Sequence, residues 1–89
     1  MKLEWDEAKR QKTLKERKLD FARCEEVFSG PTVDFADDRK DYDELRLITI
    51  GFLELEVIVI VSTQRGEATR ILSMRRATKQ EREIYAEKI

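Results

Sequence analysis

The sequence contains no histidine, one cysteine, one proline and three glycines among its 89 residues. Without histidine, neither a Ser-His-Asp triad nor a Cys-His pair can form, and a structural zinc site lacks its usual ligands. A single cysteine cannot form a disulfide within the chain, which favours a reducing, cytoplasmic compartment. The low proline and glycine content argues against a linker or a collagen-like chain. We therefore predict a folded cytoplasmic protein with no metal site and no cofactor.

Long apolar runs are also missing from the sequence. No segment approaches the roughly 20 apolar residues of a transmembrane helix, and charge begins at Lys2, so we expect no membrane association and no signal peptide. The length allows one domain, which we place at residues 1–89. A domain of this size buries roughly 60% of its unfolded surface, so a partner or oligomerisation would stabilise it.

Charges are abundant but unevenly distributed, although the net charge is only −1. Residues 1–18 carry seven Lys or Arg against four Asp or Glu, and residues 61–89 carry the same numbers. Residues 19–60 carry four basic against eleven acidic residues. If the two ends meet in the fold, they form a basic patch that can bind phosphate groups. The alternative is that both ends are solvated helices of mixed charge.

Two helices are predicted in the first third of the chain. Asp6 can cap a helix that runs to about residue 18, and Asp20 can cap a second helix. The second helix ends at the Ser-Gly-Pro sequence of residues 29–31. Its apolar residues recur with helical spacing at Phe21, Cys24, Val27 and Phe28. We expect Trp5 to act as a packing anchor and Cys24 to be a small buried hydrophobe.

Four strands and a third helix are predicted in the remainder. The strands are expected at residues 32–35, 45–52, 57–61 and 69–75. The third of these is apolar on both faces, as is typical of a central strand. Thr78 and Glu81 can form a capping box for a helix that runs to about residue 88. Short connections indicate an antiparallel meander. The prediction is an α+β fold with two N-terminal helices, a four-stranded antiparallel sheet and a C-terminal helix.

Several motifs occur in the order of a known protein family. The longest is Arg-Ile-Leu-Ser-Met-Arg-Arg-Ala at residues 70–77, followed by a final helix that contains Tyr85. The second is Trp-Asp-Glu-Ala-Lys at residues 5–9. In this order and at this length, the chain resembles the BrnT family of toxins from Trp5 to Tyr85. The resemblance implies a RelE-like fold and a ribonuclease that belongs to a bacterial type II toxin–antitoxin system.

The resemblance also implies partners. They are a BrnA-like antitoxin with a ribbon-helix-helix DNA-binding part, an RNA substrate, and operator DNA that is contacted only through the antitoxin, with a 2:2 hetero-tetramer as the expected assembly. Where many members carry Asn, Lys-His and Gly late in the first helix, this chain has Thr13, Glu16-Arg17 and Lys18. Arg17 cannot replace a histidine as an acid or a base. The alternative function is therefore a weakly active or inactive toxin-like module that acts with its antitoxin in transcriptional autoregulation.

Metal-free RNA cleavage needs a base near the 2′-hydroxyl, cations around the phosphorane and an acid for the leaving 5′-oxygen. Arginine suits the second task because its planar fork binds phosphate with two hydrogen bonds. With the family resemblance, the predicted catalytic residues are Arg75, Arg46, Arg65 and Tyr85. The predicted RNA-binding residues are Lys9, Arg17, Arg70 and Arg76. The alternatives are surface salt bridges for the arginines and an edge-of-core position for Tyr85.

Simple alternation along the strands predicts which of these side chains share a face. Arg75 should lie with Ile71 and Ser73, and Arg46 with Ile48 and Ile50. No more than half of the strand arginines at positions 65, 70, 75 and 76 should then share a face. Lys9 and Arg17 should lie within about 80° of each other on a helix. The sequence does not identify the general base for the 2′-hydroxyl, which is a carboxylate, a tyrosine, a lysine or the substrate itself. The carboxylates considered are Glu67, Asp41 and Glu44.

Overall fold

Five strands form one mixed sheet in the computed structural model, which describes residues 1–39 and 43–89. In chain order the elements are β1 (Lys2–Trp5), α1 (Glu7–Arg17), the 3-10 helix η1 (Phe21–Arg23), α2 (Cys24–Ser29), β2 (Val33–Ala36), β3 (Arg46–Leu53), β4 (Glu56–Arg65), β5 (Ala68–Arg76) and α3 (Lys79–Lys88). The strands are ordered β1-β5-β4-β3-β2 across the sheet. All neighbours are antiparallel except β1, which runs parallel to β5.

The predicted α+β class is confirmed, but the prediction of a four-stranded antiparallel sheet is wrong. The additional strand is β1, which precedes α1 and pairs from Lys2↔Ala68 to Trp5↔Ile71. Alternation of charged and apolar residues in Lys2–Trp5 has the period of a strand, yet four residues are too few to distinguish it from a helix start. β1 forms a strand because its backbone hydrogen-bonds to the otherwise open edge of β5, and this pairing joins residues far apart in the sequence.

The other elements lie close to their predicted places. The apolar segment 57–61 lies within β4, the middle strand of the sheet, and β2 forms an edge. Asp6 caps α1 by accepting a hydrogen bond from the Ala8 amide at 2.9 Å. Asp20 caps η1, which leads directly into α2. The predicted capping box of α3 is confirmed.

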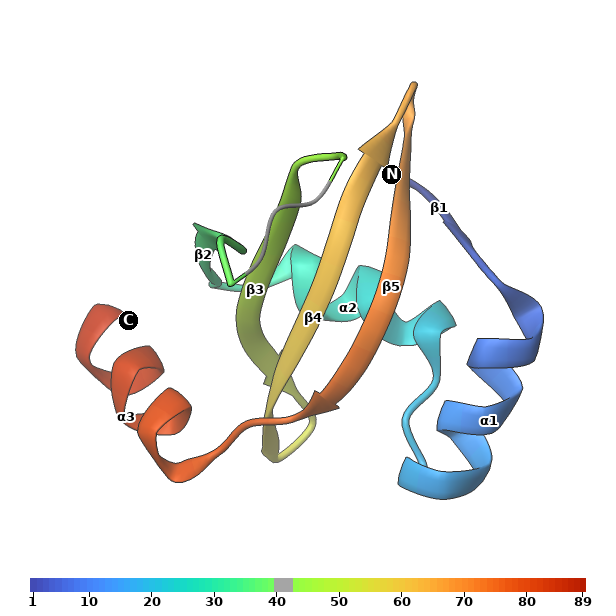
Figure 1. The fold of residues 1–89 in the computed structure, drawn as a ribbon. Coiled ribbons are helices and arrows are strands. Elements are labelled where there is room, and N and C mark those ends of the chain that lie inside the picture. Colours follow the sequence, from blue (N-terminus) through green and yellow to red (C-terminus); the bar gives the residue numbers. More distant parts are fainter. Residues whose placement is uncertain (40–42) are drawn as a thin grey trace.

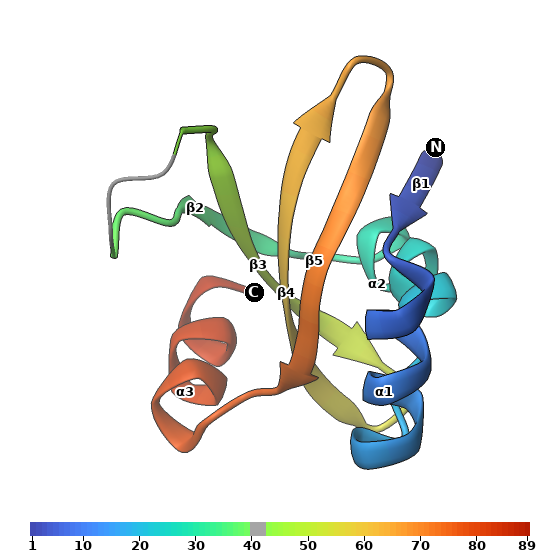
Figure 2. The same ribbon diagram turned by 45° about the vertical axis from the view of Figure 1, so that its right-hand side comes forward.

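Helices lie on both sides of the sheet, with α2 behind it, α3 at the lower left and α1 at the lower right beyond β5 (Figure 1). Figure 2 shows α3 on one side of the strands and α1 with α2 on the other. Each face carries an apolar cluster. The cluster under α2 is made of Leu19, Phe21, Cys24, Val27, Leu53, Ile58, Ile60, Ile71 and Met74. The cluster under α3 is made of Ile48, Ile50, Val59, Val61 and Tyr85.

The expectations for Trp5 and Cys24 are confirmed. Trp5 packs against the cluster under α2, and Arg10 lies over its ring at 5.7 Å from the centroid. Cys24 is fully buried, and burial raises the pKa of its thiol to about 12. Gly51 lets β3 approach α2 closely, since a Cβ there would lie 2.5 Å from a methyl carbon of Val27. Within the described ranges, no helix has the length and hydropathy needed to cross a membrane.

Candidate functional site on strand β5

A β-bulge interrupts β5 and changes which side chains share a face. Val61 pairs with Ser73, but its neighbour Ser62 pairs with Ile71, so Leu72 is an extra residue in β5. A bulge of this kind shifts the alternation of side chains by one position. The prediction that Arg75 shares a face with Ile71 is therefore wrong. Ser73 does lie on the same face as Arg75, as predicted. Ile71 instead belongs to the cluster under α2.

Three of the four strand arginines consequently lie on the α3 side of the sheet. Arg70 pairs with Thr63 and Arg75 pairs with Val59, and these partners are four residues apart on β4, so they face the same way. Arg65 lies two residues beyond Thr63 and faces this side too. The prediction that no more than half share a face is wrong, because the bulge breaks the alternation on which it rested.

Arg46 joins this group from β3. Thr63 pairs with Arg46 on one side and with Arg70 on the other. With neighbouring strands about 4.8 Å apart, the two arginine backbones lie about 10 Å from each other. Arg75 lies about 13 Å further along the strand direction by strand rise. Arg46 shares its face with the isoleucines two and four residues later, as predicted, and these belong to the cluster under α3.

Arg75 and Glu81 form a two-point ion pair at one end of this group. Arg75 Nη1 and Nη2 donate to Glu81 Oε1 and Oε2 at 2.7 and 2.8 Å. This guanidinium lowers the pKa of the Glu81 carboxyl to about 2, and the carboxylate in turn raises the pKa of Arg75. The charge of Arg39 opposes that rise, which places a further cation near Arg75. Arg39 itself binds both carboxylate oxygens of Asp37.

The other arginines of the group differ in their contacts. Arg70 donates to a carboxylate oxygen of Glu4 at 2.9 Å, which ties β5 to β1. Arg46 lies with its Nε 3.4 Å from a carboxylate oxygen of Glu44. Arg65 is exposed at the end of β4. These ion pairs hold cationic groups at the surface of the sheet while leaving them partly accessible to a ligand.

A hollow of about 300 Å³ opens where α1 lies against the bulge of β5. Its lining consists of Lys9, Lys12, Thr13, Glu16, Arg17, Leu72 and Ser73. The prediction that Lys9 and Arg17 lie on one side of the helix is confirmed. Arg17 also donates to the Met74 carbonyl at 2.9 Å, which fixes the end of α1 against β5. The hollow thus holds three cations, one carboxylate and two hydroxyl groups.

Sequence reasoning missed four residues of this region. Lys12, Thr13 and Glu16 follow Lys9 at intervals of three, four and seven residues, which is the spacing of one helix face. That signal was available in the sequence. Arg39 belongs to a short run of charged residues and carries no such signal, since only the fold brings it near Arg75.

Two of the predicted site residues, Tyr85 and Arg76, make contacts with other parts of the fold. The Tyr85 side chain lies in the cluster under α3, and its hydroxyl donates to the Pro31 carbonyl at 2.9 Å. Arg76 faces the α2 side and donates to the Glu56 carboxylate and to the Arg17 carbonyl. Arg76 therefore lies on the face opposite Arg75, whereas Tyr85 lies on the α3 side.

The carboxylates considered as the base are also dispersed. Glu67 lies in the exposed turn between β4 and β5, and Glu44 stands beside Arg46. Asp41 lies outside the described residues. In the part of the chain that the structure describes, no three His, Cys, Asp or Glu side chains gather as metal ligands would.

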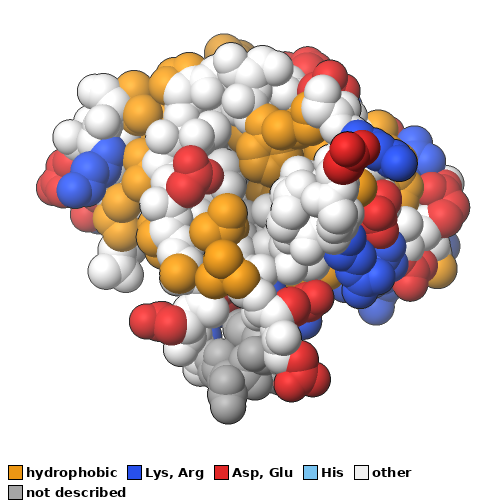
Figure 3. Space-filling model, turned by 90° about the horizontal axis from the view of Figure 1, so that it is seen from above, with side chains coloured by type: hydrophobic (Ala, Val, Ile, Leu, Met, Phe, Trp, Pro, Cys, Tyr) orange, Lys and Arg blue, Asp and Glu red, His pale blue; other side chains and the backbone are white. Residues whose placement is uncertain are grey.

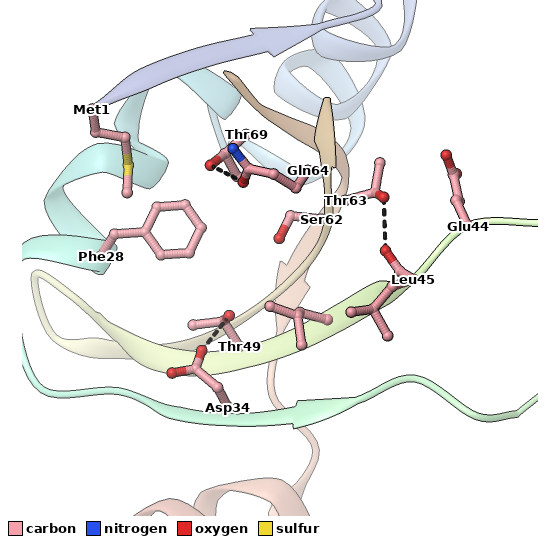
Figure 4. A pocket seen from close by; sticks show the side chains of 11 residues that line it. Met1, Phe28, Asp34, Glu44, Leu45, Thr49, Ser62, Thr63, Gln64 and Thr69 are labelled. Atoms are coloured by element: carbon pink, nitrogen blue, oxygen red, sulfur yellow. Dashed lines mark hydrogen bonds between the residues drawn. The ribbon is translucent and has the colours of Figure 1, made fainter. Parts of the chain in front are cut away.

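A second pocket, of about 390 Å³, lies on the opposite face of the sheet, next to α2. Figure 3 shows hydrophobic side chains in a hollow at this end of the molecule, and Figure 4 shows the lining at close range. The lining residues are Met1, Phe28, Asp34, Glu44, Leu45, Leu47, Thr49, Ser62, Thr63, Gln64 and Thr69. Apolar and uncharged polar side chains dominate, and both charged side chains, Asp34 and Glu44, are acidic.

One family model matches the chain over residues 5–81, and its description is "Ribonuclease toxin, BrnT, of type II toxin-antitoxin system". The matched segment includes α1, the bulge of β5 and the Arg75–Glu81 pair. A search of curated proteins found no match.

Proposed function

Because the chain belongs to the BrnT family of ribonuclease toxins of type II toxin–antitoxin systems, we propose that it is an endoribonuclease that cleaves RNA without a metal ion and so inhibits translation. The observation that carries this proposal is the bulge of β5, which places arginines on one side of the strand and the basic hollow of α1 at its edge. The family assignment favours this function over an inactive toxin-like module.

The RNA strand is proposed to run along β5. The arginines on the α3 side can contact successive phosphates, since grooves of this kind follow the backbone of single-stranded nucleic acid. Lys9, Lys12 and Arg17 supply cations from α1 on the other flank. Arg75 stabilises the phosphorane, because a guanidinium fork matches two phosphate oxygens, while Arg46 and Arg65, further along the strands, help by holding neighbouring phosphates.

The proposed reaction transfers the phosphoryl group within the RNA. The 2′-oxygen forms a bond to the adjacent phosphorus while the bond from phosphorus to the 5′-oxygen breaks. Glu16, the carboxylate of the hollow, takes the proton from the 2′-hydroxyl, and an ammonium group of Lys9 or Lys12 donates a proton to the leaving oxygen. The products are a 2′,3′-cyclic phosphate and a 5′-hydroxyl end.

Membership of a type II system implies an antitoxin partner. We propose a BrnA-like antitoxin with a ribbon-helix-helix part, which carries the contact to operator DNA, in a 2:2 assembly in the cytoplasm. Acidic or apolar side chains of this partner would cover Arg46, Arg65 and Arg75. A complex that inhibits cleavage while leaving all three arginines open would contradict steric blocking.

Cleavage of RNA by the purified chain in the presence of EDTA tests the proposal. We expect full activity and the ends named above, identified by mass spectrometry of the fragments. Glu16→Gln should lower the cleavage rate by about 100-fold or more, because general base catalysis contributes about that much, with Glu25→Gln on the exposed side of α2 as a matched control. Loss of cleavage in EDTA would exclude the metal-free mechanism, and full activity of Glu16→Gln would exclude Glu16 as the base.

A further inference from the structure

We infer that the pocket beside Phe28 and Leu47, called here the Phe28 pocket, receives an apolar side chain of the antitoxin that is flanked by basic residues. The pocket lies on the face of the sheet opposite the arginine group, so it is separate from the proposed active site. The inference rests on the antitoxin partner that the family assignment implies. It goes further by giving the antitoxin a second point of attachment of stated chemistry.

The shape and lining of the pocket suit one protruding side chain. Its volume of about 390 Å³ is near the lower end of the range of ligand sites. Phe28 forms one wall, while the Ser62 hydroxyl points inward from the sheet (Figure 4), and Leu47 also belongs to the lining. Leu45 and Leu47 are 71% and 40% exposed, so apolar surface continues from the pocket to its rim. Apolar surface gathered around a concave site is typical of a protein interface.

Charge distinguishes a basic peptide from RNA as the occupant. Asp34 and Glu44 line the pocket, and none of its described lining residues is a Lys or an Arg. Such a site repels phosphate groups and attracts a segment with Lys or Arg next to its apolar anchor. Asp34 is held in place by the Thr49 hydroxyl, which donates to its carboxylate at 2.6 Å.

The Phe28 pocket also lies close to the arginine group, because both reach the Arg46 end of β3 from opposite faces of the sheet. Leu45 and Leu47 line the pocket, whereas Arg46 between them belongs to the opposite face. Glu44 both lines the pocket and pairs with Arg46. A partner anchored in the pocket therefore needs only to pass over this end of the sheet to reach Arg46 and cover the proposed active site.

Antitoxin affinity and RNA cleavage of two rim variants test the inference. Leu45→Lys and Leu47→Lys each place a cation at the rim and should weaken binding of a purified BrnA-like antitoxin by at least about 10-fold in titration calorimetry. RNA cleavage should stay within about two-fold of the wild type, since neither residue faces the arginine group. Leu55→Lys is the matched control, because Leu55 is 92% exposed in the turn at the far end of β3 and should change neither quantity.

The outcomes separate this inference from the proposed function. Antitoxin binding that stays at the wild-type level in both rim variants would overturn the inference. Loss of RNA cleavage with intact antitoxin binding would assign the pocket to RNA and overturn it as well. Weakened antitoxin binding supports it even if the wild-type chain cleaves no RNA, in which case only the proposed catalytic function fails. A wild-type chain that does not bind the antitoxin would overturn this inference and the proposed partner, whereas the catalytic function is tested separately by RNA cleavage.

Discussion

Arg75 on β5 and Glu81 in the first turn of α3 are joined by two parallel hydrogen bonds of 2.7 and 2.8 Å. The same carboxylate accepts a hydrogen bond from the Thr78 backbone amide at 2.8 Å. One side chain thus completes the cap of α3 and orients the arginine that we propose for phosphorane stabilisation. Substitution of Glu81 should therefore affect both the stability of α3 and the orientation of Arg75, whereas substitution of Arg75 removes the proposed donor itself.

Stability should decrease as the pH falls from about 4.5 toward 2, because the pKa of Glu81 is about 2 in the folded protein against its usual 4.5. The ionised carboxylate stabilises the folded state above the unfolded pKa, and protonation removes that contribution below it. Since water still reaches this pair, we expect about 1 to 2 kcal/mol of unfolding free energy. Urea unfolding at about pH 6 and about pH 2.5 measures it. Glu81→Gln should lose less stability over this range, and an equal loss would contradict the role of Glu81.

Arg75→Ala should reduce RNA cleavage by about 100- to 1000-fold, because loss of a preorganised donor to a developing anion has an effect of that size. Arg75→Lys should recover only part of the rate, since an ammonium group keeps the charge but not the two-point geometry. Glu81→Gln breaks the ion pair but keeps the arginine, so its cleavage rate should lie above that of Arg75→Ala. Cleavage rates of the three variants measure the effect on activity, and circular dichroism shows whether each variant is folded. A folded and fully active Arg75→Ala would show that Arg75 is structural.

Tyr85→Phe should leave RNA cleavage unchanged and lower stability by about 1 to 2 kcal/mol. The hydroxyl donates to the Pro31 carbonyl, and its removal leaves that acceptor without its partner from α3. The ring remains in the cluster under α3. Urea unfolding and a cleavage assay on the same preparation give both quantities. A fall in cleavage of about 100-fold with normal stability would instead show that Tyr85 is catalytic, as predicted from the sequence.

Lys18→Gly should raise stability by about 0.5 to 1 kcal/mol. Lys18 ends α1 with φ of 60°, in the left-handed region that a side chain disfavours. The resemblance to the BrnT family implied a glycine at this point, and the backbone conformation supplies the physical reason. Lys15→Gly, inside the last turn of α1, is the matched control and should lower stability by about 1 kcal/mol. A decrease in both variants would contradict the argument.

The sequence alone predicted those structural features that depend on contacts between residues only a few positions apart. The cap of α1 at Asp6, the capping box of Thr78 and Glu81, and the shared face of Lys9 and Arg17 all depend on contacts within two or three helical turns. The central strand followed from its unbroken apolar run, because only a segment covered on both faces keeps one. The family followed from two short motifs and is confirmed over residues 5–81.

Tertiary structure alone decided how the arginines are arranged. Nothing in residues 71–73 marks an extra residue, since the bulge exists only in the pairing of β5 with β4. That one position reverses the face of every residue before it and places Arg70 with Arg75. The pairing of β1 with β5 and the approach of Arg39 to Arg75 likewise join segments far apart in the chain. Local sequence determines helices and buried strands through nearest neighbours, whereas a site built across strands depends on long-range hydrogen bonds and their register.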